Sequence, residues 1–501
     1  MTNPSAASPR RWGLAICLLS LAMALWVLQR QLPLATLPAA IWQPDLSDLA
    51  QLKVHYSWLP RFCVALLCGA ALGLAGLLMQ QVLRNPLASP TTLGVASGAQ
   101  LSLALATLYA PGLLIAGEWV ALAGGGLATL LVFALARRRG LSPLSLILAG
   151  LVISLLLGAL NVMLMLLQPM GLSAMFIWSA GSLSQNNWDA VLFLLPRLGL
   201  ALVLITLLVR PLSLLELDDS GARSLGLSLD RLRVVALALA VFMTACVVSS
   251  VGVIGFIGLA APTIARLMGA RTLRQRLVWT PLLGAALLLL TDQLVQGFAG
   301  RLSELLPTGG VTALLGAPLL LWLIPRLRLS TGRPQPSTQR TVSQPLGGHR
   351  LLPLMLLGLL LLAVVALLLG QGPQGWNWSL NPELLQWRLP RLLAALGAGL
   401  LLGLAGCLLQ RLTGNPMASP ELMGISAGAA LGLMLTLFVW IGAPFWVRLI
   451  MGFAGALLVL LVIVGFARRQ AYAPERLLLV GIAISALFDA VKMLVLSLND
   501  P

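Results

Sequence analysis

Long apolar segments, separated by short polar ones, run along the whole chain. Most approach the ~20 residues that a helix needs to cross a bilayer. The first has no small-residue cleavage site behind it, so we interpret it as a retained span. The pattern predicts spans near residues 12–29, 60–83, 92–110, 112–136, 142–168, 187–209, 233–251, 253–268, 278–297, 309–325, 351–369, 390–410, 421–440, 445–467 and 475–497. We therefore expect an all-α polytopic membrane protein.

One stretch of the chain is duplicated. Residues 59–99 recur as residues 389–429 without a gap, with 21 of 41 aligned positions identical. Both copies contain L-P-R, a glycine-spaced apolar segment ending in Gln80 or Gln410, and N-P-x-A-S-P. The repeat is too long for a solenoid unit. Duplicated membrane domains usually face each other across a substrate pathway.

Charge agrees with composition and sets the topology. The chain is 59% hydrophobic and 9% charged, far below the ~25% charged residues of soluble domains. Although the net charge is +17, the arginine clusters all fall between spans on one side, as expected of a cytoplasmic face. This reading places the N-terminus in the cytoplasm and excludes a nucleic-acid partner.

An even number of spans, ten, separates equivalent points of the two copies, so the halves should be parallel. A polar segment rich in Pro, Ser and Gly divides them and is typical of a flexible connection. We expect a first half at 1–329, a cytoplasmic linker at 330–350 and the N-terminal part of a second half at 351–501, with about five spans.

The sequence has few residues of the kinds that catalytic or metal sites need. The five cysteines lie inside spans without C-x-x-C spacing, and the two histidines and two lysines allow no H-E-x-x-H or G-x-x-x-x-G-K-[ST] motif. We expect no catalytic site, no cofactor and no metal site. The chain should not bind ATP through a phosphate loop of its own.

Several segments contain motifs that an uninterrupted membrane helix would not require. In each N-P-x-A-S-P copy two prolines prevent helix continuation, so the next helix should begin at Thr91 or Glu421. A plain tight turn is the alternative reading. The segment 252–269 is apolar but interrupted by glycine and proline, which allows close helix contact or a gate.

The most polar segment between spans is residues 216–233, on the expected cytoplasmic side. It reads as a short capped helix closed by glycine, a docking surface for a cytoplasmic partner, or as a merely solvated loop. The candidate docking residues are Asp218, Asp219, Gly221, Ala222, Arg223, Leu225 and Gly226.

At these motifs the chain resembles the FecCD-type permeases of binding-protein-dependent ABC importers. The matching segments are LPR, NPLASP, W-SAGSL, LDD-GARSLG, GFIGLAAP and TGGVTALLGAPLLLWL, in order along nearly the whole chain. The resemblance implies tandem, parallel ten-span permease halves with the BtuC-like fold. It also implies a bacterial inner-membrane location and alternating access powered by a separate dimeric ATPase. The fused halves most resemble the ferric-hydroxamate branch, although other iron-chelate, haem and cobalamin carriers share the motifs.

The resemblance also assigns roles. Basic residues at the outer ends of spans should pair with acidic residues of a periplasmic siderophore-binding protein, with helix-end snorkelling as the alternative. The candidates are Arg61, Arg388, Arg391 and, more weakly, Arg301. Pathway-lining polar residues, for which interhelical hydrogen bonding is the alternative, are Gln80, Gln410, Asn85, Asn415, Ser154, Asn161 and Ser485.

Two features stand apart from the family pattern. The second half stops after five spans, and equal halves would give roughly 660 residues, so we expect a fragment. Asp489 and Lys492 are opposite charges three residues apart inside a span, which fits either a neutralised pair or a pair lining the pathway. An ion-coupled secondary transporter remains the alternative class, although no charge within a span is duplicated.

Overall fold

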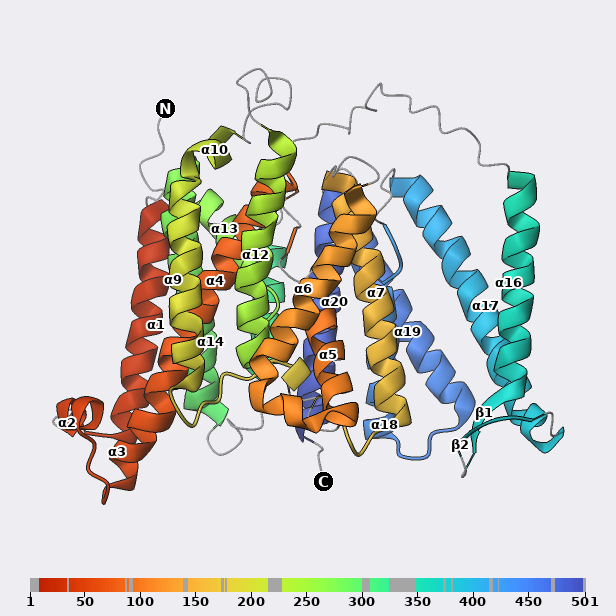
Figure 1. The fold of residues 1–501 in the computed structure, drawn as a ribbon, viewed down its shortest axis with the longest axis horizontal. Helices are drawn as coiled ribbons and strands as arrows, with labels where there is room; N and C mark the ends of the chain where they lie inside the picture. Colours follow the sequence, from red (N-terminus) through yellow and green to blue (C-terminus); the bar gives the residue numbers. More distant parts are fainter. Residues whose placement is uncertain are drawn as a thin grey trace.

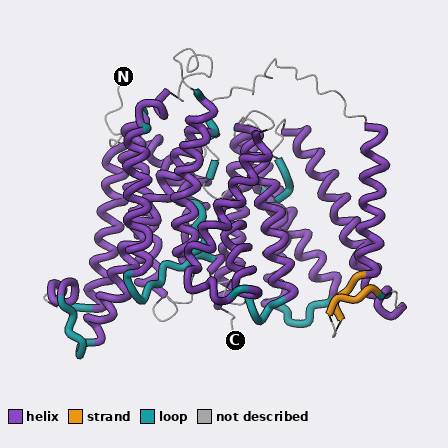
Figure 2. Tube along the Cα trace, in the orientation of Figure 1, coloured by secondary structure: helices purple, strands orange, loops and turns teal. Residues whose placement is uncertain are grey.

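The computed structural model describes residues 9–33, 36–85, 88–89, 93–137, 143–172, 175, 178–214, 228–299, 307–323, 348–372, 375–379, 382–413, 418–421, 423–469 and 474–498. Nearly all of these residues are helical, as Figure 2 shows. Ten described helices are long and apolar enough to cross a membrane, and four more are shorter and apolar. The all-α expectation is confirmed.

The first half is a bundle whose long helices lie side by side, roughly along one common direction (Figure 1). Its helices are α1 (Pro9–Gln31), α2 (Leu37–Trp42), α3 (Leu49–Lys53), α4 (Leu59–Val82), α5 (Val95–Tyr109), α6 (Gly117–Arg137), α7 (Pro143–Leu167), α9 (Asp189–Leu207), α10 (Val209–Leu214), α12 (Leu229–Val251), α13 (Ile257–Leu267), α14 (Leu273–Ala299) and α15 (Thr308–Leu323).

The second half begins with a helical hairpin whose turn carries two short strands. Its elements are α16 (Gly348–Leu368), β1 (Leu369–Gly372), β2 (Gly375–Trp378), α17 (Pro382–Thr413), α18 (Ile425–Val439), α19 (Phe445–Arg469) and α20 (Pro474–Leu498). The strands are antiparallel, with Leu369 opposite Trp378. Every predicted span falls on one of these helices, and α4 and α17 run in the same direction (Figure 1).

One boundary expectation is wrong. The helices after the two N-P-x-A-S-P copies begin at Val95 and Ile425, four residues later than expected. The residue before each is a glycine with positive φ, +77° at Gly94 and +73° at Gly424. Because a left-handed residue cannot continue a right-handed helix, it fixes the start.

Helix α4 is the centre of the first half. It packs against α9, α12, α13 and α14. In its most apolar 18-residue stretch, 72% of the residues are buried. Three of its glycines allow this close approach: a Cβ on Gly69 or Gly73 would meet the backbone of α14, and one on Gly76 would meet the backbone of Gly258 in α13. Small residues at such positions let membrane helices pack backbone to backbone.

Its duplicate, α17, carries the same glycine stripe at Gly399, Gly403 and Gly406. A Cβ on any of the three would find nothing within 4 Å, and no described α17 residue is buried. In the first half the stripe is covered by α13 and α14. Equal sequence therefore gives unequal burial, because the neighbours of the helix differ.

Candidate transport site

Three sequence motifs that lie far apart in the chain meet inside the first half. We call them the three-segment junction, which consists of residues 178–183, 251–256 and 308–312. The backbone N–H of Ser182 donates to the carbonyl of Val251 at 2.9 Å, and that of Gly309 donates to the carbonyl of Gly181 at 3.0 Å. These bonds satisfy peptide groups at the break between α12 and α13, as non-helical backbone within a membrane requires.

Glycines make the junction sterically possible. Gly181 and Gly252 have φ values of +74° and +75°, which other residues rarely adopt. A Cβ on Gly252 would collide with the carbonyl of Trp178, and one on Gly309 with that of Ala180. The predicted interruption of segment 252–269 is thus a real helix break, held by close backbone contact.

The break also places one aromatic ring. Phe256 has φ +74°, a sparsely populated conformation for a residue with a side chain, and it directly precedes α13. Its ring occupies the space where a side chain on Gly316 of α15 would be. The ring therefore joins the break to α15, which in turn packs on α20 of the second half.

The polar residues predicted to line a pathway fall into different environments. Gln80 is 7% exposed; its Oε1 accepts a hydrogen bond from Nη2 of Arg266 at 2.6 Å, while its Nε2 has no partner among the described residues. Asn161 is 3% exposed and donates from Nδ2 to the carbonyl of Ser97 at 3.1 Å. Asn161 thus makes the interhelical bond that was the alternative to pathway lining.

Ser154 and Ser485 occupy matching places in the two halves. The position of a Cβ on Gly94 lies 3.6 Å from Oγ of Ser154, and that of a Cβ on Gly424 lies 3.0 Å from the backbone N of Ser485. Each serine is half-buried beside the first residue of a helix that follows a proline pair. The duplication therefore reproduces a local contact as well as a sequence.

The other pathway candidates are less enclosed. Gln410, in the exposed α17, is itself exposed, and Asn85 is half-buried at the turn after α4, where its carbonyl accepts from the N–H of Ala88 at 3.0 Å. Asn415 lies outside the described residues.

The Arg61 side chain, a docking candidate from the sequence, is buried and engaged inside the bundle. Its Nε and Nη2 donate to Oδ1 of Asp292 at 2.9 and 2.7 Å. The two side chains are 7% and 0% exposed, and Gln296 donates to Oδ2 of the same carboxylate at 2.7 Å. The pairing turns Arg61 inward, because a buried carboxylate needs a cation and hydrogen-bond donors.

Other docking candidates stay closer to the expectation. Arg391, the repeat counterpart of Arg61, is exposed. Arg388 is half-buried, and its Nη1 donates to the carbonyls of Leu367, Leu368 and Ser379 at 2.7, 3.1 and 3.3 Å. It thus joins α17 to the end of α16 and to the residue that follows β2. Arg301 lies outside the described residues.

The coupling candidates are all beyond the described part of the chain. Asp218, Asp219, Gly221, Ala222, Arg223, Leu225 and Gly226 belong to residues 215–227, between α10 and α12. The structure does describe the two helices that flank this segment. The flanking helices α10 and α12 contact each other, so the segment begins and ends at neighbouring points.

Asp489 and Lys492 form the pair that their spacing predicts. Nζ of Lys492 lies 2.8 Å from Oδ1 of Asp489, and the side chains are 38% and 50% exposed. The pair is therefore neutralised locally but is not enclosed by the described helices.

Sequence reasoning missed the two long-range arginine contacts, Arg61 with Asp292 and Arg266 with Gln80. A signal existed for the first, since Asp292 is an isolated acid within a span and such a group requires a partner. Nothing in the spacing identified which arginine, 231 residues away along the chain, would supply it.

Comparison with known proteins agrees with this architecture. Residues 16–326 and 352–501 match the FecCD transport family. The chain is 47% identical over 477 residues to the iron(3+)-hydroxamate import system permease protein FhuB of Salmonella typhimurium, covering 94% of this chain and 69% of that protein. It is 46% identical to FhuB of Escherichia coli over 94% of this chain and 72% of that protein.

Other relatives match about half of the chain. The Fe(3+) dicitrate transport system permease protein FecC of Escherichia coli is 40% identical over 54% of this chain and 81% of its own length. A solved structure of a metal-chelate type ABC transporter in an inward-facing conformation is 30% identical, with a TM-score of 0.53, over 64% of this chain and all of that one. This multi-pass membrane transport protein belongs to the FecCD transport family.

Proposed function

We propose that the chain is the permease of a binding-protein-dependent ABC importer for ferric hydroxamate-type siderophores. The observation that carries the substrate class is the identity of 46–47% to two hydroxamate permeases, through both halves and over 94% of the chain. Relatives named for citrate, dicitrate or enterobactin reach 35–40% identity over slightly more than half of it.

Energy for transport would come from a partner. The sequence contains no phosphate-loop motif, so a separate dimeric ATPase is the expected source. We assign its docking to residues 218–226, and we place these residues and the N-terminus in the cytoplasm of a bacterial cell, because the arginine-rich segments lie on that side. The neighbouring ends of α10 and α12 support this assignment, because a movement of the segment would reach two packed helices.

The outer face would receive the binding protein. Arg391 is the strongest candidate for an ion pair with it, because its guanidinium is exposed at the outer end of α17. Arg388 would contribute through the donors that it does not use on carbonyls, and Arg301 remains a sequence-based candidate. Arg61 supports the outer end of α4 from inside the bundle instead.

The chelate would pass between the two parallel halves. Ser154 and Ser485 are the best-supported lining residues, because the duplication places both beside a helix start. Gln80 has an unused amide donor, which suits a polar ligand. Gln410, Asn85 and Asn415 complete the proposal from sequence, and Asn161 acts as support behind Ser154.

Uptake measurements test this function. The protein is expressed in cells that lack their own hydroxamate permease but keep the binding protein and ATPase, and radioactive iron is supplied as a hydroxamate chelate, as dicitrate or as enterobactin. We expect accumulation of the hydroxamate chelate alone, with loss when the ATPase is removed. Uptake that persists without the ATPase and collapses with the proton gradient would instead indicate an ion-coupled transporter.

A further inference from the structure

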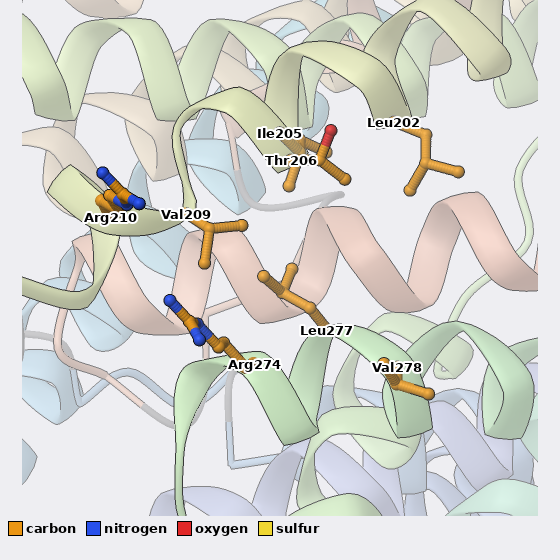
Figure 3. A pocket seen from close by; sticks show the side chains of 8 residues that line it. All are labelled: Leu202, Ile205, Thr206, Val209, Arg210, Arg274, Leu277 and Val278. Carbon is orange, nitrogen blue, oxygen red and sulfur yellow. The ribbon is translucent and has the colours of Figure 1, made fainter.

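A groove lies on the outside of the bundle between α9, α10 and α14, with a volume of about 470 Å³ (Figure 3). Its floor is Ile205, which is fully buried. Its walls include Leu202 and Val278, which are 46% and 58% exposed, with Val209 and Leu277 beside them. The groove is thus lined chiefly by aliphatic side chains and open to the surroundings.

The surface around the groove faces acyl chains. The outward side of α9 continues in exposed leucines, Leu195 at 55% and Leu200 at 57%, and α14 continues in Leu282 at 50%. In a helix that crosses a membrane, such side chains contact lipid rather than water. The occupant of the groove must therefore reach it from within the bilayer.

One end of the groove is cationic. Arg210 of α10 and Arg274 of α14 lie together beyond Val209, away from Leu202 (Figure 3). Both are exposed, and within the described part of the chain neither side chain has an ion-pair or hydrogen-bond partner. Among the described residues, none of those that line the groove is acidic. Two positive charges therefore lie where the apolar surface ends, and no described residue neutralises them.

Hydrogen bonds at the start of α14 engage the neighbours of Arg274. Gln275 and Thr272 cap the start of α14, since Oε1 of Gln275 accepts from the N–H of Arg271 at 3.0 Å and Oγ1 of Thr272 accepts from that of Gln275 at 3.3 Å. In the neighbouring Arg276, Nε donates to the carbonyl of Ala270 at 3.2 Å and Nη2 donates to that of Arg271 at 2.8 Å. Arg274 is thus left free, and the first turn of α14 adds a partial positive charge.

We infer that this groove binds an anionic phospholipid. One acyl chain would lie along Leu202, Ile205 and Val278, and the phosphate would sit between Arg210 and Arg274. Basic pockets between helices at the membrane surface bind such headgroups. The site lies at the arginine-rich end of the bundle, so it would take its lipid from the cytoplasmic leaflet, which follows from the orientation proposed above. A soluble anion would leave the apolar groove unexplained.

Photolabelling of the chain in nanodiscs tests the site. Photoactivatable phosphatidylglycerol, with the reactive group on an acyl chain, should label α9 and α14 near the groove, whereas the phosphatidylcholine analogue should label them weakly. Replacing Arg210→Gln or Arg274→Gln should lower labelling about fivefold each, the order expected for one basic residue near a membrane surface. Arg137→Gln, an exposed arginine at the same end of the bundle, should leave labelling unchanged.

Two further arms separate the alternatives. Val278→Trp fills the groove and keeps both arginines, so it should lower labelling as well; unchanged labelling would contradict an acyl-chain site. Inorganic phosphate and glycerophosphoglycerol at millimolar concentration should not compete, and full competition would indicate a soluble anion instead. Equal labelling by the two lipids would overturn the proposal. Unchanged labelling of a variant that carries both Arg210→Gln and Arg274→Gln would overturn it as well. The readout does not depend on transport, so it is independent of the substrate.

Discussion

Arg61 in α4 and Asp292 in α14 are joined in the interior of the bundle by three hydrogen bonds between guanidinium and carboxylate, 2.9, 3.0 and 2.7 Å long. The contact fastens the two helices that meet through Gly69 and Gly73. It also means that the two identical L-P-R motifs perform different tasks, since the second arginine, Arg391, is exposed.

Removing one partner of this pair should destabilise the protein strongly. We expect Arg61→Ala or Asp292→Ala to lower the free energy of unfolding by about 3–5 kcal/mol, because the remaining charge is buried without a counter-ion. Thermal unfolding of the purified protein in detergent measures this. Arg391→Ala is the matched control and should cost less than about 0.5 kcal/mol. If Arg61→Ala lowered the free energy of unfolding as little as Arg391→Ala, the ion pair would contribute little to stability.

The two glycine stripes should respond oppositely to alanine. Gly76→Ala should cost about 1–3 kcal/mol, because the added methyl group meets the backbone of Gly258 and the helices must separate. Gly406→Ala meets nothing within 4 Å and should stabilise α17 by roughly 1 kcal/mol through helix propensity. The comparison uses unfolding temperatures of the same chain. Destabilisation by Gly406→Ala would reveal that this face of α17 is covered.

Charge reversal at the outer face should weaken docking of the binding protein. Arg391→Glu is expected to reduce affinity about tenfold at low ionic strength, with a smaller loss as salt screens the interaction. Surface plasmon resonance over a salt series provides the measurement. Arg448→Glu, an exposed arginine in the first turn of α19, serves as the control. Equal losses for both variants would indicate general attraction rather than a specific pair.

The segment between α10 and α12 should control the ATPase. Arg223→Glu and Gly226→Leu are expected to abolish both iron uptake and co-purification of the ATPase while membrane insertion stays normal. The sequence predicts a short helix that Gly226 closes, and a bulky side chain at this position would remove that glycine signal. Arg231→Glu, an exposed arginine in the first turn of α12, is the control. Normal ATPase recovery from the Arg223 and Gly226 variants would contradict the assignment.

Asp489 and Lys492 should behave as a mutually neutralising pair. We expect Asp489→Asn and Lys492→Met each to lower the yield of monodisperse protein, because the remaining charge is alone within a span, and the double variant to recover it. Lys53→Met, which changes an exposed lysine outside the pair, is the control. A double variant that folds but no longer transports iron would place the pair in the pathway.

Elements were predictable where the signal is local. Apolar length located each of the long apolar helices in the described part of the chain, and glycine with proline located the break between α12 and α13. The short helices α2 and α3 and the strand hairpin were missed, because segments of four to six residues carry no usable period. Helix starts at Val95 and Ile425 were misplaced because the left-handed glycine, rather than the prolines, decides them.

The candidate site was predictable only in part. The motifs that meet at the three-segment junction were all recognised, yet their meeting depends on tertiary contacts that no spacing encodes. Asn161 was identified as significant for its polarity, but its partner Ser97 lies on another helix. The same limit applies to Arg61, whose inward direction is decided by a carboxylate far along the chain.

The three-segment junction is held by peptide groups, and this bears on how its importance would be detected. Ser182 and Gly309 reach their partners through main-chain N–H groups, so replacing a side chain does not remove either bond. At Ser182 an alanine scan would remove only the bond that Oγ accepts from the N–H of Ser184, and it would register the junction mainly at Gly181, Gly252 and Gly309, where a methyl group is itself the disturbance. Mutational tolerance at Ser182 would therefore be a poor guide to its place in the mechanism, and amide-to-ester substitution of the backbone is the perturbation that matches the bond.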